Sequence, residues 1–586
     1  MFGLFKNLKK SDWVLLTISI ALIVLQVWFE LKMPEYTAKL TTIVQSENSV
    51  MKEVWKNGAL MVACAGGSLI SAVICTVLIS RVASSFSRTL REKLYDKIST
   101  FSNAEMKKFS IPSLITRTTN DVMQMQNFMA MGVQLLIKSP IMAIWAICKI
   151  SATNINWTLA TIVAVVIIVI SICVLVGICL PKFRKIQKLT DDINNVTREN
   201  VSGVRVIRAF NAETYQEDKF EKVNNDMTSN HLFTSRAMGL MSPIMFLVMH
   251  GLTLAIYWIG AILINNIALS NMADMTARIE LVGNMTAFTQ YAMQVVMSFM
   301  MLIMIFIILP RTMVSGNRIA EVLKTEPSIV GKTSTVKTKK QGEIEFKNVS
   351  FSYTDSDNKK LTIKDISFKV EKGQTLAIIG ATGSAKTTLI NLIPRFYDTT
   401  HGEVLVDGVN VKDYPEEQLR DKIAIASQKA VLFKGTVKEN IIYGSELVDE
   451  ERINKVLEIS QSNFVSELEK GVNAEVAQGG TNFSGGQKQR LSIARALYKD
   501  AEIIIFDDTF SALDYKTDML VRKAIKDNLN STIIIVAQRI GTIKDADQIL
   551  VLEEGEIVGL GTHKELLKNC KVYQEIALSQ LSKEEL

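Results

Sequence analysis

Six long apolar stretches in the first 310 residues constrain the fold of this chain more than any other feature of its sequence. A helix needs about 20 mostly apolar residues to cross a bilayer, and each stretch is long enough. They are Trp13–Leu31, Gly58–Ser80, Met129–Ser151, Trp157–Leu180, Gly239–Ile264 and Asn284–Leu309. The sequence therefore predicts a membrane domain of six helices over residues 1–310, and it excludes an ordinary soluble enzyme.

The charges of the loops between these stretches predict their orientation. Residues 1–12, 81–127 and 181–238 carry 3, 8 and 10 Lys or Arg residues, whereas 34–57, 152–156 and 265–283 carry 3, 0 and 1. Basic loops stay on the cytoplasmic side of a membrane. We therefore expect a multi-pass membrane protein with both termini in the cytoplasm and with long cytoplasmic extensions of its helices. The modest net charge of +7 reflects these loops and does not indicate nucleic-acid binding.

A few polar and sulfur-containing residues inside the predicted spans have two interpretations each. Lys138 lies near the predicted cytoplasmic start of its span, where we expect it to reach the inner interface rather than contact a substrate. Gln290 and Gln294 either line a cavity or bond to a neighbouring helix. Five methionines of the same span suit either a surface that accepts many apolar shapes or contact with lipid; they are Met293, Met297, Met300, Met301 and Met304.

The second half of the chain has a different character. Residues 311–341 form a polar connector, and from Gly342 onward β-branched runs alternate with helical patterns. This alternation is typical of an α/β domain with a largely parallel sheet. We therefore predict three segments, a membrane domain over 1–310, a linker over 311–341 and an α/β P-loop domain over 342–586.

A phosphate-binding loop follows the apolar strand that ends at Ile379. It reads Gly380-Ala-Thr382-Gly383-Ser384-Ala385-Lys386-Thr387, followed by Thr388, and it departs from the G-x-x-x-x-G-K-[ST] pattern only at Ala385. Backbone N–H groups of such a loop cradle polyphosphate, while the lysine reaches the β/γ-phosphates and the threonine hydroxyl binds Mg²⁺. The loop predicts ATP and Mg²⁺ as ligands. A Cβ at position 385 costs about 1 kcal/mol if the backbone there has a positive φ.

Two further motifs complete the predicted nucleotide site. The apolar strand Glu502–Phe506 ends in Asp507 and Asp508, and Asp507 has the place of a Mg²⁺-binding carboxylate. Ser484, Gly485, Gly486 and Gln487 open a helical pattern and form a second anion-binding helix end. Because one γ-phosphate cannot occupy both ends of a single chain, we expect two such domains to face each other across a pair of nucleotides.

Together these motifs resemble a half-transporter of the ABC exporter family, in particular the degenerate-site subunit of a heterodimeric bacterial multidrug exporter. The segments Ile111–Asp121 and Glu199–Phe210 are similar to cytoplasmic loops of these exporters. The resemblance implies further roles for three residues. Tyr353 would stack on adenine, Gln428 would sense Mg²⁺ and the membrane domain, and Asp514 would lie at the dimer interface.

The chain departs from the family at the residues expected to hydrolyse ATP. Asp508 stands where the family has a glutamate, Gln538 where it has a histidine, and Gln478 where it has an acidic residue. Aspartate is one methylene shorter than glutamate, and a misplacement of about 1 Å can cost roughly a hundredfold in rate. Glutamine cannot carry the positive charge of a protonated histidine. The signature Ser484–Gln487, which serves the partner's nucleotide, keeps the family pattern.

These departures predict that the ATP site held by this chain is impaired. They also predict a partner half-transporter that supplies the intact glutamate and histidine. We expect the pair to move amphipathic drugs or lipids out across the bacterial cell membrane. Three alternatives stay open, namely a homodimer with drifted but active sites, a regulatory subunit with a silent ATPase, and a dedicated exporter of a peptide, a thiol or haem.

Overall fold

The computed structural model describes residues 2–46, 51–151, 154–267, 272–332, 334–338, 341–353, 361–445 and 448–581. These residues form two compact units. The helical unit comprises Met1–Ile98 and Pro112–Thr325, and the sheet unit comprises Ser99–Ile111 and Glu326–Leu586. The segment 99–111 thus groups with the C-terminal part of the chain, which its position in the sequence did not indicate.

The helical unit consists of long helices that contain all six predicted spans. They are α1 (Lys10–Gln45), α2 (Met51–Ser99), α6 (Val133–Ser151), α7 (Ile155–Ala209), α8 (Glu213–Gly239), α9 (Met241–Asn265) and α10 (Met272–Lys324). Among the described residues, five helical stretches are long and apolar enough to cross a membrane, and the sixth predicted span lies within α10, a helix of 53 residues. The predicted membrane class of the N-terminal part is confirmed.

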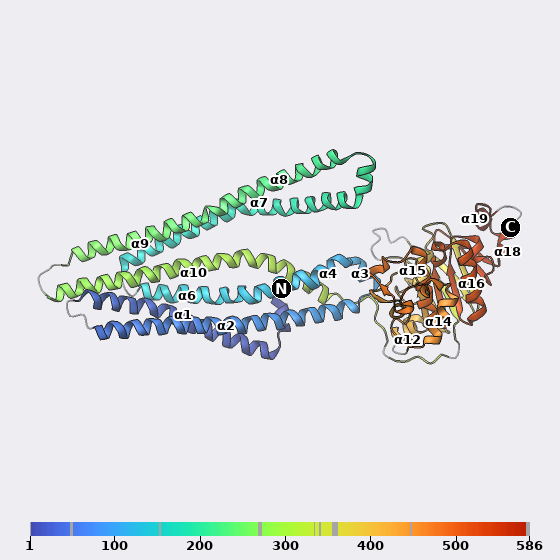
Figure 1. The fold of residues 1–586 in the computed structure, drawn as a ribbon, viewed down its shortest axis with the longest axis horizontal. Helices are drawn as coiled ribbons and strands as arrows, with labels where there is room; N and C mark the ends of the chain where they lie inside the picture. The colour runs from blue at the N-terminus through green and yellow to red at the C-terminus, as the bar shows by residue number, and fades with distance from the viewer. Residues whose placement is uncertain are drawn as a thin grey trace. The chain divides into compact units, whose positions relative to one another are not determined.

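Two features of these helices bear on function. Short helices α4 (Ile111–Thr116) and α5 (Val122–Asn127) lead into α6 through two π-helical turns, Arg117–Asp121 and Phe128–Gly132. The helices α7 and α8 continue well beyond the apolar stretches and run side by side as an arm that diverges from α1, α2, α6 and α10 (Figure 1). The predicted extension of the membrane helices is therefore confirmed.

The sheet unit contains two main sheets. The larger has the order β12-β11-β3-β10-β9-β6, and only its edge pair β11–β12 is antiparallel. Its strands are β3 (Thr375–Gly380), β6 (Ile423–Ala426), β9 (Ile503–Asp507), β10 (Thr532–Val536), β11 (Gln548–Glu553) and β12 (Glu556–Gly561). This sheet confirms the predicted α/β class with a largely parallel sheet.

The second main sheet is antiparallel, which the sequence did not indicate. Its order is β2-β1-β4-β5, with strands β1 (Ile344–Phe351), β2 (Ile363–Val370), β4 (His401–Val406) and β5 (Val409–Asn410). A small pair, β7 (Gly435–Thr436) with β8 (Glu475–Val476), lies apart from both.

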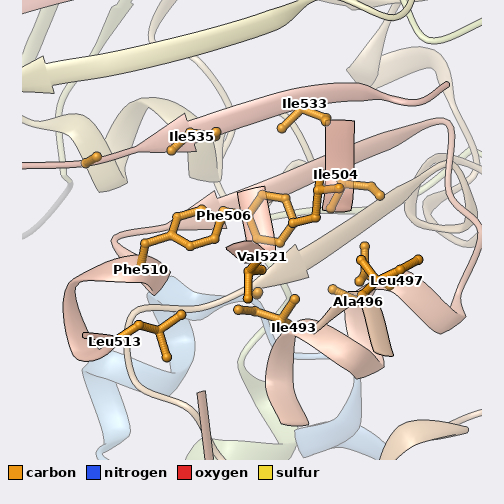
Figure 2. Packing of buried hydrophobic residues seen from close by; sticks show 14 of the residues in the cluster. Ile493, Ala496, Leu497, Ile504, Phe506, Phe510, Leu513, Val521, Ile533 and Ile535 are labelled. Atoms are coloured by element: carbon orange, nitrogen blue, oxygen red, sulfur yellow. The ribbon is translucent and has the colours of Figure 1, made fainter. Parts of the chain in front are cut away.

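Helices cover the parallel sheet and complete its core. They are α11 (Lys386–Asn391), α12 (Glu416–Asp421), α13 (Val437–Ile441), α14 (Glu450–Ile459), α15 (Gly485–Tyr498), α16 (Tyr515–Asn528), α17 (Ile540–Ile543), α18 (His563–Asn569) and α19 (Lys571–Leu578). Figure 2 shows Ile493 of α15 and Val521 of α16 packed toward Phe506 of β9. Every residue of β9 and β10 is buried, and all of them are apolar except Asp507 at the end of β9 and Thr532 at the start of β10, as expected for strands covered on both faces.

Candidate nucleotide-binding site

The candidate site lies where four neighbouring strands of the parallel sheet end. In the sheet order, β3 is followed by β10, β9 and β6, and these strands are parallel. Their carboxyl ends therefore share one edge, which is where ligands bind in open α/β sheets. The phosphate loop follows β3, Gln538 follows β10, Asp508 follows β9 and Gln428 follows β6. The topology thus brings together residues that lie up to 158 positions apart in the sequence.

The phosphate loop is a tight turn between β3 and α11. A Cβ at Gly380 would lie 2.1 Å from the carbonyl oxygen of Leu552, so only glycine fits where β3 ends. Ala385 has a left-handed backbone with φ of 73°, which is costly for a residue with a Cβ. The strain expected at this position for a positive φ is therefore present in the folded chain.

Lys386 closes this loop on itself. Its Nζ donates to the carbonyl oxygens of Gly380 and Ala381, both at 2.8 Å, and to Ser384 Oγ at 3.3 Å. Burial lowers the pKa of the Lys386 amine, and the negative charges of Asp508 and Asp507 oppose this effect. The loop oxygens thus bind the ammonium where phosphate oxygens, which are stronger acceptors, could replace them.

Thr387 and Asp507, two of the three residues predicted to bind the metal together with Gln428, are in contact. Thr387 Oγ1 donates a hydrogen bond to Asp507 Oδ1 at 3.1 Å. Burial raises the pKa of the Asp507 carboxyl; the hydrogen bond from Thr387 opposes the rise, and the charge of Asp508 adds to it. Because its surroundings destabilise the charged form of this carboxyl, a cation beside it would stabilise the carboxylate.

Asp508 is held by two glutamine side chains. Its Oδ2 accepts hydrogen bonds from Gln428 Nε2 at 3.1 Å and from Gln538 Nε2 at 2.9 Å. The residue is 8% exposed and has a left-handed backbone with φ of 47°. Asp508 and Gln538, at the positions predicted to hydrolyse ATP, and Gln428, predicted to sense Mg²⁺, are therefore neighbours, and one oxygen of the carboxylate is bound by two amide donors.

The signature residues and Asp514 form helix ends of their own. Ser484 Oγ accepts from the backbone N–H of Gln487 at 3.3 Å, and Gln487 Oε1 accepts from the backbone N–H of Ser484 at 2.9 Å. This capping box starts α15. Asp514 caps α16 by accepting from the backbone N–H of Thr517, which lowers the pKa of its carboxyl. Within the described residues, no hydrogen bond joins Ser484, Gln487 or Asp514 to the phosphate loop.

Tyr353 is linked to the helix that follows the phosphate loop. Its hydroxyl lies 3.0 Å from Thr388 Oγ1, and its ring meets those of Phe351 and Tyr397 nearly at right angles. The residue predicted to stack on adenine thus lies beside the start of the helix that follows the phosphate loop. The bond to Thr388 gives this threonine, predicted only as part of the loop, a defined structural role.

The residues present fit Mg²⁺ and a nucleotide triphosphate. Within the described residues, no group of three or more His, Cys, Asp or Glu gathers as a metal site. Thr387, Asp507 and Gln428 offer a hydroxyl, a carboxylate and an amide oxygen, and Mg²⁺ with nucleotides commonly takes one or two carboxylates besides phosphate and water. The metal, when bound, would neutralise charge developing on the phosphates. Asp507 and Thr387 would orient it.

A separate polar cluster lies inside the helical unit. Glu30 Oε1 accepts hydrogen bonds from Gln26 of α1, Ser68 of α2 and Lys138 of α6, the last at 2.9 Å. Gln294 of α10 donates to the backbone oxygen of Glu30 at 3.2 Å. Four helices thus meet at one residue. Of the two interpretations of Gln294, the hydrogen bond between helices is the one observed.

The expectation that Lys138 reaches the inner interface is wrong. Lys138 forms an ion pair with Glu30, which lies at the far end of the first predicted span, and their side chains are only 14% and 17% exposed. The Lys138 ammonium is bound by a carboxylate of another helix and is not directed to the interface. An acid and a base inside two predicted spans were the signal that could have revealed the pair.

A helical unit with membrane-spanning helices, joined to a sheet unit with a phosphate loop and its metal ligands, defines an ATP-dependent membrane transporter. Comparison with known proteins gives the family. The model for the ABC transporter transmembrane region matches residues 16–299, and the ABC transporter model matches residues 363–511. The chain belongs to the ABC transporter family.

Individual relatives agree with this result. The chain is 37% identical over 530 residues to an ABC transporter ATP-binding protein of Mycobacterium bovis whose function is uncharacterized, covering 89% of this chain and 88% of that one. It is 32% identical over 514 residues to an ATP-dependent lipid A-core flippase of Desulfotalea psychrophila, covering 85% of each. The fold matches a bacterial Atm1-family ABC exporter with ATP bound, with a TM-score of 0.80 at 21% identity over 97% of this chain and 99% of that chain.

These findings define the general activity. The chain is an ATP-driven exporter half-transporter, in which a transmembrane domain is fused to an ATP-hydrolysing domain. It is a multi-pass protein of the bacterial inner membrane.

Proposed function

We propose that this chain is the degenerate-site subunit of a heterodimeric exporter of amphipathic drugs or lipids. It binds ATP with Mg²⁺ at its own phosphate loop and presents Ser484–Gln487 to the nucleotide of a partner half-transporter. The partner carries a glutamate and a histidine at the positions of Asp508 and Gln538. The competent site of the pair is therefore the partner's.

The main support for this proposal is the way the Asp508 carboxylate is hydrogen-bonded. A general base must reach the water it activates, at about 3 Å or through one further water. Asp508 Oδ2 instead accepts from both Gln428 and Gln538. The backbone oxygen of Gln538 in turn accepts from Gln580 Nε2 at 2.7 Å. The shorter side chain is thus fixed among neutral amides, with no imidazole to stabilise the charge that develops on the phosphate.

The proposed substrate class rests on the helical unit and on the relatives. The flippases among the relatives are named for lipid A-core, an amphipathic lipid. A cavity of about 810 Å³ in the helical unit is lined by charged Glu35 and Lys149 beside aromatic Phe288 and Tyr291. Two of the α10 methionines, Met297 and Met304, are exposed. The charged and aromatic lining of this cavity suits amphipathic molecules, and the exposed methionines of α10, which lie outside that lining, add a separate flexible apolar surface.

A purification with and without a partner tests the proposal. The chain would be expressed alone and together with the half-transporter encoded beside it, and ATP hydrolysis would be measured in both preparations. We expect little hydrolysis from the chain alone. In the pair, changing the partner's glutamate to glutamine should abolish hydrolysis, while Asp508→Ala should change it less than about twofold. Brisk hydrolysis by the chain alone, abolished by Asp508→Ala, would refute the proposal.

A further inference from the structure

The short helix α3 (Asn103–Phe109) lies in the segment between α2 and α4, yet it is part of the sheet unit. Ser102 and Glu105 form a capping box at its start. Glu105 is 7% exposed and also accepts a hydrogen bond from the backbone N–H of Ser328 at 3.2 Å. A buried carboxylate with these partners fixes the first turn of α3 to the sheet unit.

The last turn of α3 contacts the aromatic residues beside the phosphate loop. Lys107 Nζ lies 4.4 Å from the centroid of the Tyr353 ring and 5.7 Å from that of Tyr397. The two rings are perpendicular, at 89°, with centroids 5.2 Å apart. Within the described residues Lys107 has no carboxylate as an ion-pair partner. Its ammonium is therefore held by the π face of Tyr353.

Lys107 covers one face of the Tyr353 ring, and this is the face on which we place a stacking base. Phe351 is buried in the core of the sheet unit, and Tyr353 and Tyr397 pack against that core. Lys107 is an exposed residue, so it covers the ring from the solvent side. The Tyr353 hydroxyl is bound to Thr388 in the first turn of α11, which fixes the ring beside the phosphate loop.

We infer that Lys107 occupies the base-binding face of Tyr353 in the nucleotide-free chain and that adenine displaces it from this face when ATP binds. The inference rests on the proposed function of Tyr353 as the surface on which adenine stacks. A purine and an ammonium cannot both lie against the same face of one ring. Binding of the base thus breaks a contact of α3, the helix that connects α2 to α4, whereas binding of the phosphates alone does not.

Comparing ATP with a ligand that lacks a base tests this inference. The full chain and its Lys107→Met variant would be titrated with ATP and with inorganic tripolyphosphate, both with Mg²⁺. Methionine keeps the length of the side chain and removes its charge. Because the lost contact competes with adenine, we expect the variant to bind ATP about two- to fivefold more tightly. Its affinity for tripolyphosphate should equal that of the unchanged chain.

The neighbouring lysine provides a matched control. Lys108 lies on the same helix, with its Nζ 5.6 Å from the centroid of the Phe109 ring. Lys108→Met should change neither affinity. In the unchanged chain, ATP but not tripolyphosphate should increase amide hydrogen exchange of residues 103–109, and the Lys107→Met variant should lose this difference. ATP binding that is unchanged or weaker in Lys107→Met would overturn the inference.

A separate variant tests the underlying proposal that adenine stacks on Tyr353. If adenine stacks on Tyr353, Tyr353→Ala weakens the binding of ATP and leaves tripolyphosphate unaffected. ATP binding that is insensitive to Tyr353→Ala would remove the proposed role of Tyr353, whatever Lys107→Met does. A tyrosine-dependent affinity combined with no tightening in Lys107→Met would remove only the competition by Lys107.

Discussion

Gln538 donates a hydrogen bond from its side-chain amide to Asp508 Oδ2 at 2.9 Å, across the ends of two neighbouring strands. The contact connects the two positions at which this chain departs most from the ABC exporter pattern. A glutamine that binds the adjacent carboxylate orients it, yet contributes no positive charge toward a phosphate. Changing both residues together therefore probes the site more sharply than changing either one.

The double change Asp508→Glu with Gln538→His should increase ATP hydrolysis by the chain purified alone. The longer carboxylate reaches further toward the attacking water, and imidazolium stabilises charge on the phosphate. We expect an increase of up to about a hundredfold in the rate of phosphate release. Asp508→Asn with Gln538→His is the control, since it restores the imidazole without a base. Equal rates for both variants would contradict the assignment of Asp508.

The same double variant distinguishes a regulatory subunit from a drifted enzyme. In the complex with its partner, substrate transport and phosphate release would be measured in the same vesicles. If the site is a drifted enzyme, the double change should raise substrate transport and phosphate release in the same proportion. A regulatory site should hydrolyse more ATP for each substrate moved, because a subunit that normally holds ATP then releases it.

Replacing Ala385 by glycine should stabilise the sheet unit. The left-handed backbone of Ala385 costs about 1–2 kcal/mol for a residue with a Cβ, and glycine adopts it freely. Part of this gain is lost because glycine makes the unfolded chain more flexible. We expect a net gain of about 0.5–1 kcal/mol in the free energy of unfolding, measured by denaturant titration. Ala381→Gly, in the same loop, should give no gain.

Asp507→Asn should stabilise the nucleotide-free protein. It should also remove the dependence of ATP binding on Mg²⁺. Because the pKa of the Asp507 carboxyl is raised, the folded chain holds this proton more tightly than the unfolded chain. The stability contributed by the protonated Asp507 carboxyl is therefore lost as the pH rises from its pKa in the unfolded chain, about 3.9, through its raised pKa in the folded chain. At pH 8 the variant should melt at a higher temperature than the unchanged chain, while its ATP affinity no longer responds to Mg²⁺.

Asp514→Asn serves as the control for this pH dependence. The Thr517 amide lowers the pKa of Asp514, so its contribution is present above the ordinary pKa and is lost as the pH falls through the lowered value. Asparagine is also a good helix cap. This variant should melt no higher than the unchanged chain at pH 8. Equal stabilisation by both substitutions would indicate a general effect of removing negative charge.

The ion pair between Glu30 and Lys138 should show strong coupling in a double-mutant cycle. Either single change, Glu30→Met or Lys138→Met, leaves one charge without its partner inside the helical unit. The double variant replaces the pair with two apolar side chains and should recover much of the loss. We expect a coupling energy of about 0.5–3 kcal/mol, measured by unfolding in detergent.

An exposed pair of the same residue types provides the comparison. Lys219 donates to Glu199 at 2.7 Å on the α7–α8 arm, with side chains 38% and 55% exposed. The corresponding methionine cycle should give a coupling below about 1 kcal/mol, because exposed pairs are screened by water. Equal coupling in the two cycles would show that Glu30 and Lys138 are hydrated.

Much of the nucleotide site could be predicted because its parts are local patterns at the ends of strands. The phosphate loop and Asp507 each follow an apolar run, and the order of parallel strands brings Thr387 and Asp507 together. The roles of Tyr353 and Gln428 required a family resemblance. Gln428 lies 80 residues from Asp508 in the sequence, and no local pattern indicates that the two are in contact.

Two findings depend on how helices pack, which the sequence does not show directly. Lys138 pairs with Glu30, 108 residues away in the sequence, and the hydropathy of neither span indicates that these two side chains meet. The cation–π contact of Lys107 joins α3 to Tyr353, which lies 246 residues further along the chain in the same sheet unit. Neither hydropathy nor motif spacing relates such distant residues.

The position of Glu30 has a consequence for how the helices can move. Besides a hydrogen bond from Gln26 within α1, the Glu30 side chain accepts hydrogen bonds from α2 and α6, and its backbone oxygen accepts one from α10. In an apolar medium no water replaces a hydrogen bond that is stretched, so partial separation of these helices is costly. Moving α2, α6 or α10 away from α1 at this level therefore breaks a hydrogen bond to Glu30 for each helix that moves. Sliding of these helices against one another costs more here than it would between purely apolar faces.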